Sequence, residues 1–513
     1  MRIRHLAWLA LALLASAPAA AQTLTITLKA DIRGTNPGVN RDDDTDVVTL
    51  HMVEGLVAYR ENGTVGPLLA EAVELSEDGR TYTFRLRKGL KFHNGADLTA
   101  EDAVWSWNRY MDPKTEWRCL SEFDGRGSVK VEAVAAPDPH TVTMRISKPY
   151  ALFLDSLARS DCGSAAVIHK DSLNPDGSWK APVGTGPFKF GEWKRGQQIT
   201  LARYDGYVSP SGEARDGFTG KKKVLVDEVR FLVVPDASTV KAGLQAGRLD
   251  IAEIAEADIP ELSKSESVKV LIGSTGGRHA VLFQTTDPVF KSVTMRQAIA
   301  AALDMNQIVA VAADGRVKPN GSTIHSRSPY YSAVQARGTT YDPARAKKLL
   351  AQAGYKGERI RITTNNRKSA PSFNIAVVIQ AMLQEVGVAV DLDVVEWATH
   401  MDRFLKGNYQ VMVHSYSSRF DPALSFEHFT GPKNSQPRKV WDNPEVQALL
   451  EKASVTTNEA ERQTLFDDMH QRMLNETPLL ILFNALDAWA TSARVEGFTP
   501  YEGRARAWRS EER

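Results

Sequence analysis

The sequence predicts an α/β protein of two or three domains, and three observations support this prediction. The chain has 513 residues, and chains of this length usually divide into several domains. Residues 76–110 combine tight-turn dipeptides, an alternating strand and a capped helix, which is typical of an α+β unit. Residues 359–416 alternate between strand and helix patterns, which favours a largely parallel sheet covered by helices. The two stretches therefore belong to domains of different architecture.

The N-terminal residues have the composition of an export signal. Basic residues precede an apolar run, LAWLALALLASA, and Ala19–Ala21 supplies the small side chains of a cleavage site. We expect residues 1–21 to be removed as a signal peptide, so that the mature chain starts at Gln22. A transmembrane anchor is the alternative, but the apolar run is shorter than the roughly 20 residues that span a bilayer. Because no cysteine before Cys119 can accept a lipid at the cleavage site, we expect a soluble mature protein.

The α+β unit is predicted from its turns, its strand and its helix cap. Asp-Gly at 78–79 and Asn-Gly at 94–95 are the dipeptides that favour tight hairpin turns. Thr99 occupies the N-cap position of a helix that we expect to end before Pro113, because proline disfavours a helical residue ahead of it. The strand between the two turns alternates, and its apolar residues are Tyr82, Phe84 and Leu86.

The remaining elements of the first half are mostly strands. Residues 47–60 have a helical pattern that ends in a turn at Glu61–Gly63. The predicted strands and later helices follow in chain order: a strand at 24–30, strands within 129–147 and 183–204, a strand at 226–235, and helices at 236–249 and 257–265.

The second half is dominated by helices, with strands between them. The predicted helices are 293–313, 342–354, 372–387, 398–407 and 444–475. The predicted strands are 359–365, 388–397, 410–416 and 478–490.

Charge and cysteine content exclude some functions and suggest one crosslink. The formal net charge is +1, so no overall field favours nucleic acid or anionic lipid. The one basic run, Lys221–Lys223, is predicted to be a solvated loop. The only cysteines are Cys119 and Cys162, which we expect to form a disulfide in an oxidising compartment, with two free thiols as the alternative.

Motifs for catalysis or metal binding are not convincing. The acidic run Asp42–Asp46 resembles the start of a calcium loop, but Val47 occupies the position that requires glycine, so a solvated loop is predicted. The eleven histidines form no HExxH motif, and no GxSxG motif occurs. Gly184–Gly186 lacks the third glycine of a dinucleotide-binding loop. We therefore expect no enzymatic activity, no metal site and no cofactor.

The stretch from Gly66 to Arg109 closely resembles the signature of a known family. It reads GPLLAEAVELSEDGRTYTFRLRKGLKFHNGADLTAEDAVWSWNR, and it resembles the family 5 extracellular solute-binding proteins, the dipeptide-, oligopeptide- and nickel-binding class that serves ABC importers. The resemblance continues in VGTGPFKFGEWKRGQQITLAR, VRFLVVPDASTVKAGLQAGRLDIAE, MRQAIAAALDMNQIV, YDPARAKKLLAQAG, VVEW and FDPALSF. These segments follow the family's order over most of residues 24–500.

The resemblance implies an α/β fold with two lobes that close on a ligand, and an extra α+β subdomain inserted in lobe I. Two crossing strands, near residues 278–284 and 481–488, would act as the hinge. The implied division is residues 22–50, 176–275 and 485–513 for lobe I, 51–175 for the inserted subdomain, and 276–484 for lobe II.

The resemblance also points to the ligand site. In dipeptide and oligopeptide binders of this family an aspartate anchors the peptide's α-ammonium group, and Ser418 stands at the corresponding position. The arginine that dipeptide binders use for the peptide carboxylate falls near Phe373–Asn374, and neither residue matches. Arg367 and Arg419 are nearby and could receive an anionic group instead, because a guanidinium holds a carboxylate through two parallel hydrogen bonds. For each arginine, a solvent-facing position is the alternative.

Further candidates come from segments that approach the ligand in this fold. Trp397 is expected as an aromatic wall of the cleft, or alternatively as a core side chain. Thr185 and Phe188 lie in a loop of the family motif, where backbone packing is an equal explanation. The predicted ligand-binding residues are Arg33, Asn36, Thr185, Phe188, Arg367, Trp397, Tyr416, Ser418, Arg419 and Asp421.

The function implied is that of a periplasmic solute-binding protein. It would capture a peptide or peptide-like solute and deliver it to an inner-membrane ABC permease, acting as a monomer without nucleic acid. The alternative within this fold is a non-peptide solute, anionic or a modified amino acid; nickel-chelate or haem uptake is less supported because no Met- or His-rich cleft is visible. From other classes, a secreted hydrolase would need a nucleophile–base pair, and a structural or chaperone role would predict no saturable binding of small molecules.

Overall fold

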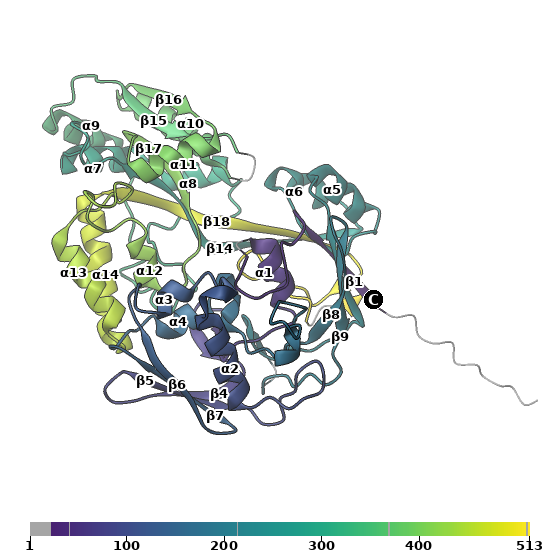
Figure 1. Cartoon of the computed structure of the whole chain (residues 1–513). Helices are drawn as coiled ribbons and strands as arrows, with labels where there is room; N and C mark the ends of the chain where they lie inside the picture. The colour runs from purple at the N-terminus through teal and green to yellow at the C-terminus, as the bar shows by residue number, and fades with distance from the viewer. Residues whose placement is uncertain (1–21, 41, 213, 368–369, 509–510, 513) are drawn as a thin grey trace, which may run out of the picture.

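A ten-stranded sheet runs through the whole molecule and connects two groups of strands (Figure 1). The computed structural model describes residues 22–40, 42–212, 214–367, 370–508 and 511–512, so the predicted signal peptide lies outside the described residues. The strand order is β16-β15-β17-β14-β18-β13-β1-β12-β9-β8. Within the described ranges no helix has both the length and the apolar character needed to cross a bilayer.

The first group of strands is built from the N-terminal quarter and the middle of the chain. Leu24, Ile26 and Leu28 alternate with partly exposed residues along β1 and are buried, as the period-2 pattern predicts. Strand β1 pairs in parallel with β12, and β8 and β9 form the predicted hairpin at the edge. The elements are β1 (Thr23–Leu28), β8 (Phe188–Lys194), β9 (Gln198–Arg203), β12 (Glu228–Val233), α5 (Ala237–Gln245), β13 (Ile251–Glu253) and α6 (Ile259–Leu262).

The predicted α+β unit forms a separate four-stranded antiparallel sheet, β4-β5-β7-β6, against which α2 packs. The side chains of Tyr82, Phe84 and Leu86 are buried on one face of β5. Thr99 and Asp102 form a capping box at the start of α2, and the helix ends at Met111, as predicted. The elements are β4 (Ala70–Leu75), β5 (Thr81–Leu86), α2 (Ala100–Met111), β6 (Val131–Asp138) and β7 (Thr141–Ile146).

Parallel pairing dominates the second group of strands, as the strand–helix alternation predicts. Strand β15 pairs in parallel with both β16 and β17, and helices cover the sheet. The elements are α7 (Val293–Ala302), α8 (Met305–Ala312), α9 (Pro343–Gln352), β15 (Ile360–Thr364), α10 (Ser372–Glu385), β16 (Val390–Val394), α11 (Trp397–Lys406), β17 (Val411–Tyr416), α12 (Pro422–Glu427), α13 (Pro444–Val455) and α14 (Glu459–Glu476).

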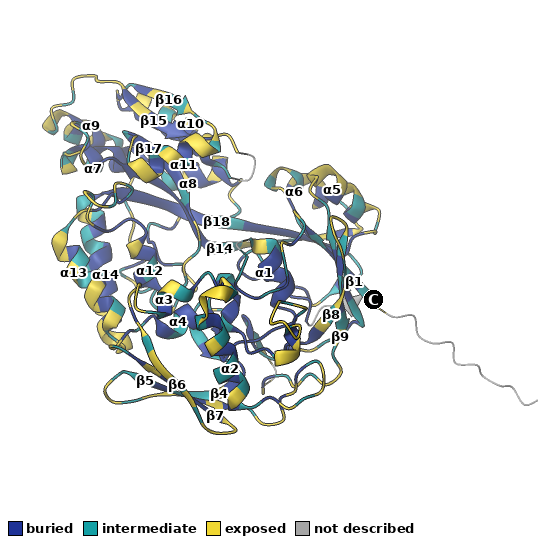
Figure 2. Cartoon of the chain, viewed as in Figure 1, coloured by how far each residue is buried: buried dark blue, intermediate teal, exposed yellow. Residues whose placement is uncertain are grey.

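Two long antiparallel strands, β14 (Val268–Phe283) and β18 (Leu479–Ser492), join the two groups. Their register shifts between Ser274 and Arg278, so the Thr275–Gly277 segment leaves the ladder near the middle of β14. Figure 2 shows that β18 is buried over most of its length. The two strands that the sequence predicts as a hinge therefore do connect the two groups, through an irregular central segment.

One buried apolar cluster links the α+β unit to helices of the second group. It contains Phe84 of β5 and Trp107 of α2 together with Phe426 of α12 and Phe466 of α14. The outward faces of α13 and α14 are exposed, whereas their inward faces are buried (Figure 2). The α+β unit and the helices α12 to α14 thus share a core across the predicted lobe boundary.

The predicted helix at 47–60 is wrong for most of its length. The structure has α1 (Asp43–Thr49) and then a hairpin of β2 (Val57–Tyr59) and β3 (Val65–Pro67). Backbone pairing beyond the segment decides this, because Glu54 pairs with Val167 and a Cβ on Gly55 would lie 2.1 Å from the carbonyl oxygen of Ser164. The acidic run is not a solvated loop either, since Asp42 caps α1 and Asp46 is buried.

Two other predicted helices are each divided by a polar cap. The helix at 293–313 breaks into α7 and α8, because the Asp304 side chain accepts the first free N–H groups of α8. The helix at 444–475 breaks into α13 and α14, because Asn458 caps α14 in the same way. The remaining short elements are η1 (Pro113–Thr115), α3 (Leu120–Phe123), α4 (Phe153–Ala158), η2 (Ser160–Ala165), η3 (Lys170–Ser172), β10 (Arg215–Asp216), β11 (Thr219–Gly220), η4 (Glu256–Asp258), β19 (Val495–Glu496) and β20 (Glu511–Glu512).

Cys119 and Cys162 form a disulfide, with their Cα atoms 5.6 Å apart. The bond ties α3 to the η2 segment beside the buried ring of Trp117, whose Nε1 donates to the carbonyl oxygen of Cys162. This crosslink agrees with the expectation from the sequence and ties two segments of the α+β unit together.

Candidate functional site

A pocket lies where the hinge strands, the β2–β3 hairpin and the C-terminal segment meet. Its space is about 350 Å³, including the part that opens to solvent. One wall comes from Glu61–Gly63 and Glu502, and the other from residues 324–328 and 419–425, with Gly276 of β14 between them. By the predicted boundaries these walls belong to lobe I and lobe II respectively. The pocket thus occupies the position expected of a ligand cleft.

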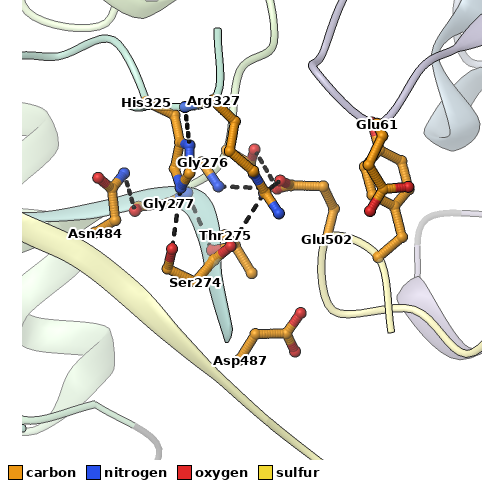
Figure 3. A network of polar contacts seen from close by, with 12 residues as sticks. Glu61, Ser274, Thr275, Gly276, Gly277, His325, Arg327, Asn484, Asp487 and Glu502 are labelled. Carbon is orange, nitrogen blue, oxygen red and sulfur yellow. Dashed lines mark hydrogen bonds and ion pairs between the residues drawn. The ribbon is translucent and has the colours of Figure 1, made fainter. Parts of the chain in front are cut away.

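Glu502 is the best-anchored side chain of this pocket (Figure 3). Its Oε2 atom accepts hydrogen bonds from the Gly276 backbone N–H and from Ser418 Oγ, both at 2.9 Å. Its Oε1 atom lies 2.5 Å from Nη2 of Arg327, and its side chain is only 4% exposed. Figure 3 shows the Arg327 and Glu502 side chains pointing toward one another across the pocket.

The backbone at Glu502 is strained. Its φ angle of 52° lies in the left-handed region, where a residue other than glycine costs on the order of 1–3 kcal/mol. The turn is held by backbone hydrogen bonds in both directions between Tyr501 and Arg504. The fold therefore fixes the direction of this carboxylate at a cost in stability.

Gly276 allows this close approach because it has no side chain. A Cβ atom there would lie 2.4 Å from Ser418 Oγ, well inside contact distance. Glycine at this position lets the backbone N–H reach the carboxylate of Glu502 while the Ser418 hydroxyl reaches it from the side.

A second buried carboxylate lies close to the first. Asp487 of β18 accepts hydrogen bonds from Trp489 Nε1 at 2.7 Å and from the Gly503 N–H at 3.2 Å. Burial raises the pKa of both Asp487 and Glu502, the Asp487 carboxylate raises the pKa of Glu502 further, and Arg327 lowers both. The guanidinium of Arg327 is thus a positive charge that acts on both of these buried carboxyl groups.

His325 completes the polar network beside Arg327. Its Nε2 atom lies 3.0 Å from Ser274 Oγ, and its Nδ1 atom accepts the Arg327 backbone N–H at 3.0 Å. Burial and the nearby guanidinium lower the pKa of His325 to about 4, so the ring is neutral at pH 7.

Arg419 provides positive charge on the opposite wall. Its side chain is exposed, and Nη1 donates to Ser417 Oγ at 3.0 Å and to the Ser418 carbonyl oxygen at 2.7 Å. Desolvation and the nearby Arg159 guanidinium lower the pKa of Arg419. Among the described residues no carboxylate forms an ion pair with it within 4.0 Å, which leaves its other nitrogens available to an anionic group.

Of the predicted ligand-binding residues, Arg419 lines the pocket and Ser418 contacts it through Glu502. Arg367 and Trp397 meet each other, with the Arg367 Cζ atom 3.7 Å from the indole ring centroid, but they do not line the pocket. Tyr416 is buried beneath Arg278, whose Cζ lies 5.5 Å from the phenol ring centroid.

The other predicted residues have partners outside the pocket. Asp421 caps α12 and forms a buried ion pair with Arg462 at 2.8 Å. Asn36 accepts a hydrogen bond from Arg109, and the exposed Arg33 lies 3.9 Å from Asp42. These contacts favour structural roles, because each side chain is held by the protein itself.

Thr185 and Phe188 are buried in the part of the chain that the sequence assigns to lobe I. Phe188 is fully buried in the core beside β1. Thr185 donates to Glu54 Oε2 at 3.1 Å, and Lys222 lies 2.7 Å from Glu54 Oε1 with both charged side chains almost inaccessible. The sequence predicts a solvated loop at Lys221–Lys223, and for Lys222 this prediction is wrong, because its side chain is buried against Glu54.

Sequence reasoning missed Glu502, Arg327 and Gly276. Glu502 lies 84 residues from Ser418, and no motif or spacing connects the two. A Gly-Gly pair directly before the predicted hinge strand was the one local signal of a close backbone approach.

Comparison with protein-family models gives a match over residues 64–437 to the bacterial extracellular solute-binding proteins, family 5, middle region. The chain belongs to this family. The fold is accordingly the α/β, two-lobed fold of solute-binding proteins, which confirms the fold class and the family that the sequence predicts.

Two curated relatives show how far the similarity extends along the chain. Heme-binding protein A of Haemophilus influenzae is 28% identical over 477 residues, covering 86% of this chain and 83% of that protein. The dipeptide-binding protein of Escherichia coli is 27% identical over 516 residues, covering 95% and 94%. The family member described here is thus similar along nearly its whole length to proteins named for different ligands.

Solved structures agree on the fold. The ABC transporter substrate-binding protein CtaP of Listeria monocytogenes has a TM-score of 0.81 at 24% identity, covering 96% of this chain and 99% of that chain. The binding protein AgaA from A. tumefacien R10, in complex with agropinic acid, has a TM-score of 0.68 at 28% identity, covering 96% and 99%.

Proposed function

We propose that this family 5 protein binds a peptide or peptide-like small solute between its lobes and delivers it to an ABC permease in the inner membrane. The observation that carries the proposal is the pocket beside the hinge strands, with Glu502 on one wall and Arg419 on the other. Oppositely charged walls suit a zwitterion such as a free peptide, whose carboxylate would face Arg419. The relative named as a dipeptide-binding protein supports this ligand class.

The mechanism follows from the connection between the lobes. Strands β14 and β18 change register at Ser274–Arg278, where bending disrupts few ladder hydrogen bonds. A solute that contacts both walls does so only when the lobes are together, so it shifts the population toward the closed form. In the described conformation the two walls are in contact beside the pocket, where the ring centroids of Tyr59 and Phe420 lie 4.1 Å apart. Binding and release need no covalent chemistry.

The proposed setting is the periplasm. Cleavage of residues 1–21 would release the mature protein there, and a single copy would present the closed form to the permease. The family description as extracellular solute-binding proteins supports export. The lobe boundaries proposed from the sequence are kept, with the pocket between them.

A second candidate is a non-peptide solute that is anionic or a modified amino acid. Ser418 stands where peptide binders of the family have an aspartate, and Arg419 has no carboxylate partner in the described part of the chain. The similar structure in complex with agropinic acid supports this candidate. Both candidates place an anionic group against Arg419.

Replacing Arg419 tests the shared element of the two candidates. Arg419→Ala should weaken binding by about 1.5–3 kcal/mol, the range for charge-assisted hydrogen bonds, in titration calorimetry with dipeptides and with carboxylate amino-acid derivatives. Arg359→Ala is the matched control, because Arg359 is an exposed arginine that does not line the pocket. Equal affinities for Arg419→Ala and wild type would remove the proposed anion contact, and turnover of either compound would instead support a hydrolase.

A further inference from the structure

We propose that Glu502 binds the cationic group of the solute, and that the Arg327 guanidinium occupies that group's position in the described conformation. The inference rests on the proposed function and adds the residue that would select a positively charged group. The ligand class is a solute with a free ammonium or guanidinium group. Arg327 would then leave the carboxylate when the solute enters.

The Glu502 side chain is fixed in position. Its Oε2 atom is held by the Gly276 N–H and by Ser418 Oγ, each at 2.9 Å, and its backbone sits in a left-handed turn. A carboxylate that is 4% exposed needs a cation or water in contact with it, because the desolvation of an unpaired charge is strongly unfavourable. Its Oε1 atom is the one that faces the pocket and takes a cation.

The Arg327 side chain is replaceable. Its side chain is 38% exposed, against 4% for Glu502. Nη2 donates to Glu502 Oε1 at 2.5 Å and to the Ser274 carbonyl oxygen at 3.0 Å. If the guanidinium turns to solvent, these two oxygens form a ready acceptor pair for the N–H groups of an ammonium. A long, partly exposed side chain can make this movement without any change in the core.

Arg327 also contributes to the charge balance of the pocket wall. Asp487 lies close enough to Glu502 to influence its protonation and is itself 94% buried, since its exposed fraction is 6%. Departure of Arg327 without a replacement would remove from Glu502, and from Asp487 behind it, the guanidinium that lowers the pKa of both carboxyl groups. A cationic group of the solute restores the balance, whereas a neutral group does not.

A permanent interlobe ion pair is the competing explanation, and it predicts the opposite response to removal of Arg327. If Arg327 only holds the lobes together, Arg327→Ala should weaken or leave unchanged the binding of a solute. If Arg327 occupies the cation's position, Arg327→Ala removes a competitor and binding becomes tighter.

The experiment is titration calorimetry with an equimolar mixture of dipeptides and with the same mixture N-acetylated, using the full mature chain. Wild type should bind the free mixture and bind the acetylated one more weakly. Glu502→Gln keeps the shape of the side chain and should weaken binding of the free mixture roughly 10- to 150-fold, the fold-change of a charge-assisted hydrogen bond. Arg327→Ala should tighten it roughly two- to fivefold, because a partly exposed ion pair is weak.

The outcomes separate this inference from the proposed function. If wild type binds the free mixture and either Glu502→Gln or Arg327→Ala leaves that binding unchanged, the role of Glu502 is overturned while the proposed function stands. Equal binding of free and acetylated mixtures overturns it as well. Binding of neither mixture by wild type overturns both the peptide function and the inference. Should Glu502→Gln fail to fold, the direction of change in Arg327→Ala decides.

Discussion

Two ion pairs in this molecule have similar distances and opposite surroundings. Lys222 Nζ lies 2.7 Å from Glu54 with the side chains 2% and 1% exposed, and Arg327 lies 2.5 Å from Glu502 with 38% and 4% exposed. Glu54 also accepts hydrogen bonds from Tyr207 OH and Thr185 Oγ1, so both partners of that pair are enclosed. In the pair at the pocket only the carboxylate is enclosed. Distance alone therefore does not distinguish a structural pair from one whose partner can be exchanged.

The difference has an energetic consequence. Removing either partner of an enclosed pair leaves a buried charge without compensation, which is strongly destabilising. Removing Arg327 opens Glu502 to water or to a cation from solution. The first pair stabilises the protein interior, and the proposed role of the second is to permit exchange at the pocket.

The largest effect is expected from breaking the enclosed pair. Lys222→Ala should lower the free energy of unfolding by about 3–5 kcal/mol, measured by urea denaturation, because Glu54 would remain buried without a cation. Lys223→Ala is the control, since this neighbouring lysine is exposed and should change stability by less than about 0.5 kcal/mol. A small effect for Lys222→Ala would show that the two pairs are equivalent.

Asp46 extends the comparison to a buried carboxylate whose nearest guanidinium, Arg504, is 4.0 Å away. Burial raises the pKa of Asp46 to about 8, so the folded protein keeps a proton there that the unfolded chain releases above about pH 4. The stability that this carboxyl contributes is present at low pH and is lost as the pH rises toward 8.

Asp46→Asn should remove this dependence. The difference in unfolding free energy between Asp46→Asn and wild type should grow with pH, by at most roughly 1.4 kcal/mol per pH unit between pH 5 and 8. Urea denaturation at several pH values measures it, and titrating histidines cancel because both proteins contain them. A constant difference across this range would mean that Asp46 is ionised in the fold.

A substitution at Gly276 tests how firmly the Glu502 carboxylate is held. Gly276→Ala should destabilise the protein by about 1–3 kcal/mol, because its Cβ would meet Ser418 Oγ at 2.4 Å and force a shift. Gly273→Ala is the matched control, since a Cβ there would meet its nearest neighbour, the Asp487 Cβ, at 4.0 Å. Thermal denaturation compares the two, and similar losses would show that the approach at Gly276 is not tight.

The smallest effect on stability is expected from Arg327→Ala. A pair with one partner 38% exposed contributes about 0–1 kcal/mol, far below the Lys222–Glu54 pair. Urea denaturation of Arg327→Ala beside Lys222→Ala measures the contrast directly. A loss comparable to that of Lys222→Ala would show that Arg327 is structural.

Local patterns predicted the elements that local interactions determine. The Thr99 cap, the alternation along β5 and the strand–helix order from β15 to β17 all depend on neighbouring residues, and the structure has each of them. The segment 50–60 was predicted incorrectly because pairing with Val167 outweighs its helical pattern. Asp304 and Asn458 each stand within a sequence pattern that continues the helical repeat. Each becomes a helix cap only because the chain turns at that residue.

The candidate site could be predicted only in part. Ser418 and Arg419 belong to a recognisable segment, so the resemblance places them near the ligand. Glu502 reaches the same position from the C-terminal segment through contacts with Gly276 and Ser418, and these long-range contacts leave no pattern in the sequence.

The central claim is that the cleft takes a solute carrying both a cationic and an anionic group. Native mass spectrometry of protein purified from its source cells without refolding, with fragmentation of the released solute, tests it most directly. The account predicts a bound mass whose solute contains a free amine or guanidinium and a carboxylate. A bound solute without a positive group would contradict it.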